Sequence, residues 1–466
     1  MKNAVTRLCL LALTVALFYI PDSAAQATLL AVGELDKSSA GSFADLSHLT
    51  YKLENGVRAN ELGGMGSAIT YAGGNTFLAL PDRGPNAVSF DSNIDDTVSY
   101  INRFHSVSMD LEPNRHRGGL PFTLTPSLRR TTLLWSLTPL VYGTGDSLVG
   151  PGAPPLNNFF QHYFTGRSDN FDPAQNSGNP KDARFDTEGI RLSNDGRSVF
   201  ISDEYGPYVY QFDRFTGLRL RSFTLPSSFY VSTLSAMGST EIALNTSGRV
   251  ANKGMEGLAI TPDGKTLVGI MQNALIQDAA EGKAQSKLLR IVTIDIASSA
   301  VTHQYGYVLT TGSGVSEILA LNNHELLVDE RDGHGRGDGS DAVVKQIFKI
   351  NLDGATDIST MDANAALPFA VPKTLFLDLV QLLTANGLAP GNIPAKIEGI
   401  AFGDDVRLRG QTFHTLWIAN DNDFLETVAD ASGNQIPNPN QFFVVGFTDA
   451  DLAGSTFVPQ HIVPLR

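Results

Sequence analysis

The sequence predicts an all-β protein of the β-propeller class, and three observations support this fold. The chain holds 44 glycines and 23 prolines among 466 residues with 42% hydrophobic residues, so it is globular and too rich in turn residues for a helical protein. A hairpin pattern recurs five times along it. The second strand of each hairpin is apolar on both faces, as a strand packed between two neighbouring sheets would be. A closed ring of such sheets leaves few free edges.

Each repeat starts with Glu-Gly-apolar or a variant, turns at a polar or Asp-Gly step, and ends in an apolar strand followed by acidic or amide residues. The repeats start at residues 67, 188, 256, 317 and 398. Alternate positions of the first strands are apolar, as at Ile190 and Leu192. The steps 194–196 and 262–264 are typical hairpin turns, because their glycines supply the positive φ that tight turns need.

The spacing of the repeats predicts the number of blades. Successive repeats start 121, 68, 61 and 81 residues apart, and the first interval is about two blades long. The missing repeat would lie near residues 104–145, where 107–111 and 131–137 have the composition of strands. We therefore expect six blades, with seven as the alternative. Residues 150–187 are expected to form a long loop over one face, and residues 372–386 a short capping helix that Gly387 ends.

The N-terminus has the features of a secretory signal peptide over residues 1–27. Lys2 and Arg7 precede an apolar stretch of 13 residues, and small residues end the segment at Ala27. This stretch is shorter than the ~20 residues that cross a bilayer. We expect a periplasmic or secreted protein whose single domain, residues 28–466, has no membrane span. Cys9 is the only cysteine, so disulfides, zinc–thiolate sites and cysteine nucleophiles are excluded from the mature chain.

The net charge is acidic, with 34 Lys and Arg against 48 Asp and Glu, or −14 at pH 7. Such a surface repels nucleic acid and anionic lipid and favours cations. We therefore expect no nucleic-acid partner.

The acidic residues of the repeats should gather at one end of the ring. In an antiparallel hairpin the first residue of one strand and the last of its partner lie at the same end. Crowded carboxylates raise one another's pKa, and a divalent cation, most simply Ca²⁺, compensates them. The expected metal ligands are Glu188, Glu256, Glu317, Glu398, Asp82, Asp203 and Asp421. The alternative is that each carboxylate binds neighbouring backbone amides and closes the ring structurally.

Several motifs together resemble the phytase-like domain family, often described as having esterase-like activity. They cover most of the chain after the signal peptide, and are residues 81–86 with 103–104, 186–190 with 202–206, 252–257, 327–332 with Lys345, and 396–399 with 420–424. The resemblance implies a propeller with an acidic central site, similar in architecture to calcium-dependent phytases. It does not imply phytate as the substrate. Ser67 and Ala68 depart from the pattern, standing where other repeats have Glu-Gly.

The chemistry predicted for this site is metal-dependent hydrolysis of a small phosphate or carboxylic ester. Such a site needs a metal to activate water and cations to hold the developing charge. The residues expected nearest to the chemistry are Glu204, Glu330, Arg331 and Arg83. No Gly-x-Ser-x-Gly motif of a serine esterase occurs in the chain. Two alternatives remain: a non-catalytic propeller that binds a ligand or partner, and ion pairing of these arginines with neighbouring acids.

Overall fold

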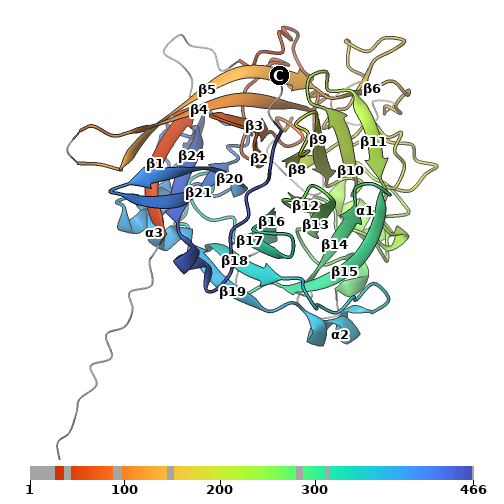
Figure 1. The fold of residues 1–466 in the computed structure, drawn as a ribbon. Coiled ribbons are helices and arrows are strands. Elements are labelled where there is room, and N and C mark those ends of the chain that lie inside the picture. Colours follow the sequence, from red (N-terminus) through yellow and green to blue (C-terminus); the bar gives the residue numbers. More distant parts are fainter. Residues whose placement is uncertain are drawn as a thin grey trace, which may run out of the picture.

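The computed structural model describes residues 27–35, 44–87, 97–116, 118–143, 152–279, 287–310, 312 and 314–463. The predicted signal peptide, apart from Ala27, lies outside these residues. Over the described residues the chain forms a ring of five four-stranded antiparallel sheets, or blades (Figure 1). No helix in this part of the chain has the length and apolar character needed to span a bilayer.

Blades 1 to 4 are each formed by strands that follow one another along the chain. Blade 5 combines an N-terminal strand with three C-terminal strands. Blade 1 holds β2 (Ala68–Tyr71), β3 (Thr76–Leu80), β4 (Arg103–Pro113) and β5 (Phe122–Leu133). Blade 2 holds β8 (Thr187–Leu192), β9 (Ser198–Asp203), β10 (Val209–Asp213) and β11 (Arg219–Phe223). Blade 3 holds β12 (Met255–Ile260), β13 (Thr266–Met271), β14 (Leu288–Asp295) and β15 (Ala300–Val308).

Blade 4 holds β16 (Gly314–Ala320), β17 (Glu325–Arg331), β18 (Lys345–Asn351) and β19 (Lys373–Asp378). Blade 5 holds β20 (Ile397–Leu408), β21 (Gln411–Asn420), β24 (Asn440–Phe447) and, from the N-terminal end, β1 (Thr28–Leu35). Two small pairs lie outside the blades: β6 (Trp135–Ser136) with β7 (His162–Tyr163), and β22 (Thr427–Ala429) with β23 (Gln435–Pro437). The α-helices are α1 (Gly238–Leu244), α2 (Ala363–Ala366) and α3 (Leu379–Ala385).

The prediction of six blades, with seven as the alternative, is wrong, because the long first interval does not contain another blade. Residues 107–111 belong to β4, and 131–133 to β5, so they complete blade 1. The rest of the interval, from residue 134 to 186 where described, is irregular chain that carries only the short pair β6–β7. The distance between repeats along the chain includes loops as well as strands. The long inserted loop therefore gave the first interval the length of two blades.

The predicted helix over residues 372–386 is half correct. Residues 373–378 form β19, which pairs with β18 as the outer strand of blade 4, and the helix α3 begins only at Leu379. The Asp378 side chain accepts a hydrogen bond from the backbone N–H of Gln381 (2.9 Å) and so caps α3. Pairing with residues 373–378 satisfies the backbone hydrogen-bonding groups at the edge of β18. This tertiary contribution exceeds the helix preference of the local sequence.

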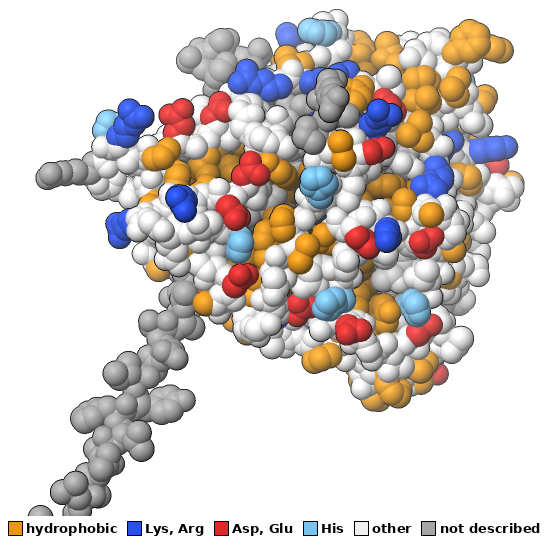
Figure 2. Space-filling model, in the orientation of Figure 1, with side chains coloured by type: hydrophobic (Ala, Val, Ile, Leu, Met, Phe, Trp, Pro, Cys, Tyr) orange, Lys and Arg blue, Asp and Glu red, His pale blue; other side chains and the backbone are white. Residues whose placement is uncertain are grey.

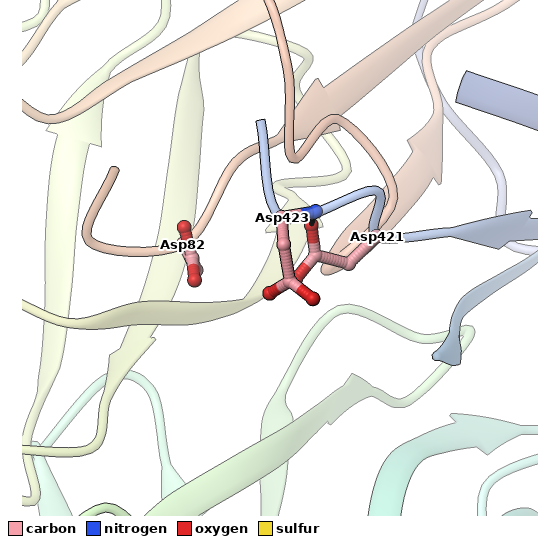
Figure 3. A group of neighbouring side chains, drawn as sticks. All are labelled: Asp82, Asp421 and Asp423. Carbon is pink, nitrogen blue, oxygen red and sulfur yellow. Dashed lines mark hydrogen bonds between the residues drawn. The ribbon is translucent and has the colours of Figure 1, made fainter. Parts of the chain in front are cut away.

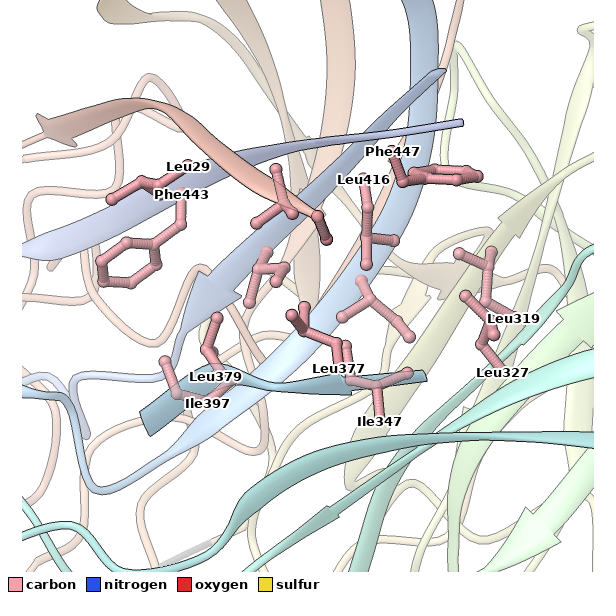
Figure 4. Close-up of a cluster of buried hydrophobic side chains, with 14 of the residues drawn as sticks. Leu29, Leu319, Leu327, Ile347, Leu377, Leu379, Ile397, Leu416, Phe443 and Phe447 are labelled. Atoms are coloured by element: carbon pink, nitrogen blue, oxygen red, sulfur yellow. The ribbon is translucent and has the colours of Figure 1, made fainter. Parts of the chain in front are cut away.

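The core lies in layers between neighbouring blades, as the two-sided apolar strands predict. The first strands of the blades contact one another in the ring order β2, β8, β12, β16, β20 and again β2. In each second strand adjacent residues point into different layers: Leu326 packs between blades 3 and 4, and Leu327 between blades 4 and 5. Figure 4 shows the latter layer, where Leu327 and Ile347 of blade 4 face Leu416 and Phe443 of blade 5.

The C-terminal segment, residues 456–463, crosses one end of the ring (Figure 1). The N–H of Val458 donates to the carbonyl of Leu321 (2.9 Å), and the N–H of Val463 to that of Asn194 (2.8 Å). Both acceptors follow the last residues of first strands, so the starts of these strands lie at the opposite end. On the face with the C-terminal segment, acidic and basic side chains are interspersed with apolar ones (Figure 2).

Candidate functional site at the mouth of the ring

The starts of the first strands and the ends of the second strands meet at the end of the ring away from the C-terminal segment, which we call the mouth. The strand registers show this directly, because Thr187 pairs with Asp203 and Ile397 pairs with Asn420. The mouth encloses a cavity of about 270 Å³. Its lining includes six carboxylates, from Asp82, Glu188, Glu204, Glu256, Glu398 and Asp421, and four cationic side chains, from Arg83, Lys253, Arg331 and Lys396.

Three of the eleven residues predicted for the site lie outside the lining of this cavity. Glu317 is fully buried and pairs with Arg191 (2.9 Å), below the mouth. Arg191 also donates to the carbonyls of Ile69 (2.9 Å) and Ile318 (3.0 Å), so it joins the first strands of blades 1, 2 and 4. This ion pair closes the axis beneath the cavity.

Glu330 and Asp203 are likewise held by partners of their own. Glu330 pairs with Lys373 and accepts hydrogen bonds from the Tyr307 hydroxyl (2.5 Å) and the N–H of Thr310 (3.1 Å). Asp203 accepts from three backbone N–H groups, those of residues 186, 205 and 206. These contacts give both carboxylates a place in the scaffold around the mouth.

Two groups of acidic residues at the mouth each bring carboxylate oxygens within 4.8 Å of one another. The first is Asp186, Glu188 and Glu204, all buried. The second is Asp82, Asp421 and Asp423, in which Asp421 and Asp423 come from one turn after β21 and face Asp82 after β3 (Figure 3). Asp186 and Asp423 were not among the predicted site residues, although each lies two residues from one that was.

The cationic side chains of the mouth pair with these acids. Arg83 contacts Asp186 through its Nη1 (2.9 Å), and its backbone N–H also donates to that carboxylate (3.2 Å). Arg331 pairs with Glu398 and donates from Nε to the Ser316 hydroxyl (2.7 Å).

Lys253 and Lys396, which sequence reasoning did not place at the site, complete the set. Lys396 contacts Asp421 (2.8 Å) and Asp423, and Lys253 contacts the Gln272 side chain (3.2 Å). Lys396 lies one residue before β20 and Lys253 two residues before β12, both within the motifs that carry the family resemblance. Their position in these motifs is the feature of the sequence that could have identified them as site residues.

Burial raises the pKa of several mouth carboxylates. It holds the pKa of Glu188, Glu256 and Asp82 well above the usual range, with further increases from neighbouring acids. Burial also raises the pKa of Glu398 to about 7, although Arg331 and Lys396 act in the opposite direction. The Glu204 carboxylate lies near that of Glu256 and adds to the increase in its pKa.

The donor set fits a hard divalent cation. Its ligands are carboxylate and amide oxygens, which Ca²⁺ prefers, and no thiolate or imidazole lines the cavity among the described residues. With every group ionised, the lining side chains carry two more negative than positive charges, which one divalent ion would neutralise. In the described chain, Oε2 of Glu256 is buried without a hydrogen-bond donor, while Oε1 accepts from Gln272 (2.7 Å).

The backbone at the mouth is strained at three residues. Asn252, Asp423 and Phe424 have φ values of 55°, 51° and 57°, in the left-handed region that non-glycine residues rarely occupy. Such conformations persist where the surrounding structure enforces them, and they cluster at functional sites. Asn252 lines the mouth cavity, and Asp423 and Phe424 follow Asp421, which also lines it, so the strained residues lie in and beside the candidate site.

Comparisons with known proteins identify the family. A secreted, uncharacterized protein of Arthroderma benhamiae is 36% identical over 179 residues, covering 32% of this chain and 35% of that protein, so the chain matches about a third of that relative's length.

Among solved structures, the hydrazine synthase of Kuenenia stuttgartiensis is 10% identical with a TM-score of 0.30, covering 77% of this chain and 78% of that one. A provisionally assigned 6-phosphogluconolactonase from Bacteroides uniformis is 12% identical with a TM-score of 0.31, covering 81% and 88%. TM-scores this low say nothing about activity. The model of the phytase-like family, described as "esterase-like activity of phytase", matches residues 60–424, which is more than half of the chain. The chain therefore belongs to the phytase-like family.

Proposed function

We propose that the protein is an exported hydrolase of small phosphate or carboxylic esters, that it acts at the mouth, and that it depends on a divalent cation, most simply Ca²⁺. One observation carries the proposal: a single cavity combines close, buried carboxylates with four cationic side chains. A site that only bound cations would have no need of those arginines and lysines. Ester hydrolysis needs both signs, because negative charge develops on the ester oxygens as water attacks.

The residues divide into two roles under this proposal. Asp186, Glu188 and Glu204 would hold the cation, which when bound would polarise an ester oxygen and lower the pKa of a water molecule. Arg83 and Arg331 would bind the anionic oxygens of the ester from the cavity wall.

Proton transfer falls to Glu204 and Glu256. Because the Glu204 carboxylate disfavours a second negative charge on Glu256, one member of the pair would stay ionised and could accept a proton from the attacking water at a carboxylate oxygen. The protonated member can donate one to the leaving group.

A non-catalytic, ligand-binding propeller is the second candidate, and the ion pairs of the mouth favour it. Arg83–Asp186, Arg331–Glu398 and Lys396–Asp421 already compensate much of the buried charge without a cation. A ligand would then exchange places with these partners, with no chemical step.

A substrate panel separates the two candidates. Phosphomonoester, phytate, lactone and p-nitrophenyl ester substrates are assayed with Ca²⁺ and with EDTA. We expect turnover that EDTA abolishes, and a loss of roughly a hundredfold in kcat/KM for Arg331→Gln, since removing one charge-stabilising donor has an effect of this size. Arg197→Gln, at an exposed hairpin turn, is the matched control. No turnover at high concentrations of Ca²⁺-loaded enzyme would favour the binding module.

Export is also part of the proposal, on the strength of the N-terminal sequence. Because β1 begins at Thr28 and forms part of blade 5, signal cleavage must leave this strand intact. We expect the mature protein to begin near Gln26 or Thr28. N-terminal sequencing of protein recovered from the exporting cell checks this, and an intact Met1 on cytosolic protein would contradict it.

A further inference from the structure

A second cavity, which we call the groove, opens directly beside the mouth. Its volume is about 790 Å³, and it shares Asp82, Arg83, Asn252 and Lys396 with the mouth. The two cavities are therefore adjacent and share one wall. The rest of the groove wall is largely apolar, with Val57, Pro85, Ala87, Phe424 and Leu425 beside Glu61, Asn86 and Asp423.

The sizes of the two cavities show what each can hold. Pockets for small-molecule ligands measure about 300–1,000 Å³, so the mouth, at about 270 Å³, has room for a reacting group but little more. The Arg191–Glu317 pair closes the axis below it. The remainder of a substrate bound in the mouth therefore extends outward from it, and the groove is an adjoining cavity with apolar residues in its wall.

The aromatic wall of the groove is rigidly held. The ring of Phe424 packs edge-on against Tyr100, with 5.1 Å between ring centroids. Gly63 and Gly64 make room for it, because a Cβ on either glycine would lie 2.6–2.7 Å from Phe424 atoms. The φ of 57° at Phe424 is a strained conformation kept by these contacts. Next to it, 51% of the Leu425 surface is exposed.

We propose that the groove binds the apolar part of an ester whose anionic reacting group occupies the mouth. This inference rests on the proposed function and names its substrate class: an ester with a single reacting phosphate or carboxyl group and one apolar substituent of about the size of an aromatic ring. A multiply phosphorylated polyol has no apolar group to bury there. The carboxylates of Glu61 and Asp423 in the groove would also repel additional phosphates.

The binding test uses benzylphosphonate and methylphosphonate, whose C–P bonds resist hydrolysis. Their phosphonate groups mimic a phosphate ester, and they also mimic the tetrahedral intermediate of carboxylic ester hydrolysis. Calorimetry in Ca²⁺ should show tighter binding of benzylphosphonate to the wild type. Leu425→Ser should reduce this preference by about tenfold, since each apolar carbon that the ligand buries contributes roughly fourfold. Leu220→Ser is the matched control, because Leu220 in β11 is equally exposed (52%) and lies away from both cavities.

The outcomes separate the groove from the hydrolase itself. Equal affinities, no binding of either phosphonate, or a preference unchanged by Leu425→Ser would overturn the groove assignment. The kcat/KM values for benzyl and methyl phosphate give an independent readout, because intrinsic reactivity cancels when variant and wild type are compared. Turnover without a size preference would refute the groove alone. A phosphonate preference without turnover of any ester would refute the hydrolase and leave the groove.

Discussion

Ionisation of the buried carboxylates at the mouth is energetically unfavourable. Glu188 is buried beside Asp186 and Glu204, and burial together with Glu256 keeps its pKa well above the usual range. Ionised carboxylates this close need compensation from a proton, an ion pair or a metal ion. Asp186 has Arg83 for this purpose, whereas no ion pair involving Glu188 occurs in the described chain. Glu188 is therefore the residue on which the metal assignment depends most.

Glu188→Gln tests the metal assignment. In EDTA the variant should be as stable as the wild type or more so, because an amide replaces a carboxyl group whose ionised form burial and neighbouring acids disfavour. In Ca²⁺ the wild type should gain about 2.7 kcal/mol at a hundredfold excess over Kd, and the variant less. Thermal melting in EDTA and Ca²⁺ measures this, with Glu112→Gln on the exposed end of β4 as the control. A wild-type melting curve indifferent to EDTA, in protein able to take up Ca²⁺, would leave the metal ligands unsupported.

Asp329 should make the protein less stable as the pH rises. It lies in β17, 1% exposed, with Oδ2 lacking a hydrogen-bond partner in the described chain. Burial raises its pKa from 3.8 to about 8. The folded state therefore holds this proton more tightly than the unfolded state, and the resulting stability, complete below pH 4, is lost as the pH rises toward 8.

Asp329→Asn should consequently lose less stability than the wild type between pH 5 and pH 8. Urea unfolding at both pH values measures the difference, and Asp353→Asn, at an exposed position, should behave like the wild type. Identical pH profiles for Asp329→Asn and the wild type would show that Asp329 ionises normally.

Among the elements, the first strands depend on the glycine of the Glu-Gly motif. Each of these glycines faces the first strand of the next blade. A Cβ on Gly189 would lie 2.7 Å from Leu258, one on Gly257 would lie 2.7 Å from the backbone N of Ile318, and one on Gly399 would lie 2.9 Å from the carbonyl of Gly66. Glycine thus lets neighbouring first strands approach closely around the axis. This spacing keeps the preceding glutamates at a narrow mouth.

Gly257→Ala should destabilise the fold by about 1–3 kcal/mol, because the new methyl group meets backbone that can yield only by widening the ring. Urea unfolding measures the loss. Gly333→Ala is the control, since a Cβ there has no neighbour within 4 Å and its φ is not positive. Equal stability of the two variants would contradict the close-approach argument.

The whole ring is closed by β1, which pairs with β24 from Thr28 opposite Gly446 to Leu35 opposite Asn440. Leu30 of β1 is fully buried between blades 5 and 1, in the layer that contains Trp417. Beyond the contact of β20 with β2 near the axis, β1 contacts β5 of blade 1, so this strand strengthens the packing between blades 5 and 1. Loss of its packing should therefore weaken the ring as a unit.

Leu30→Ala should cost about 2–5 kcal/mol of unfolding free energy, the usual loss for a buried leucine. Urea unfolding of proteins that carry Trp135→Phe, followed by both Trp417 fluorescence and far-UV circular dichroism, tests whether the midpoints shift together. Leu220→Ala, at an exposed position, should leave both midpoints in place. A shift in the fluorescence midpoint alone would show that blade 5 unfolds separately.

The sequence alone determined the propeller class, the hairpin repeat and the gathering of acidic residues at one end. These features follow from local patterns, because side-chain alternation and turn residues report which faces of a strand are buried and where it reverses. The hairpin pattern places the first residues of these strands at the same end of the ring. One cavity is therefore lined by Glu188, Glu256 and Glu398.

Only the tertiary structure decided the rest. Five blades, the pairing of β19 with β18, the partners of Glu317 and Glu330, and the groove beside the mouth all depend on contacts between segments far apart in the chain. An inserted loop lengthens the chain without adding a blade, and a free strand edge can recruit residues whose local pattern favours a helix. The free energy of packing the whole ring determines these features. A local sequence pattern carries no information about that free energy.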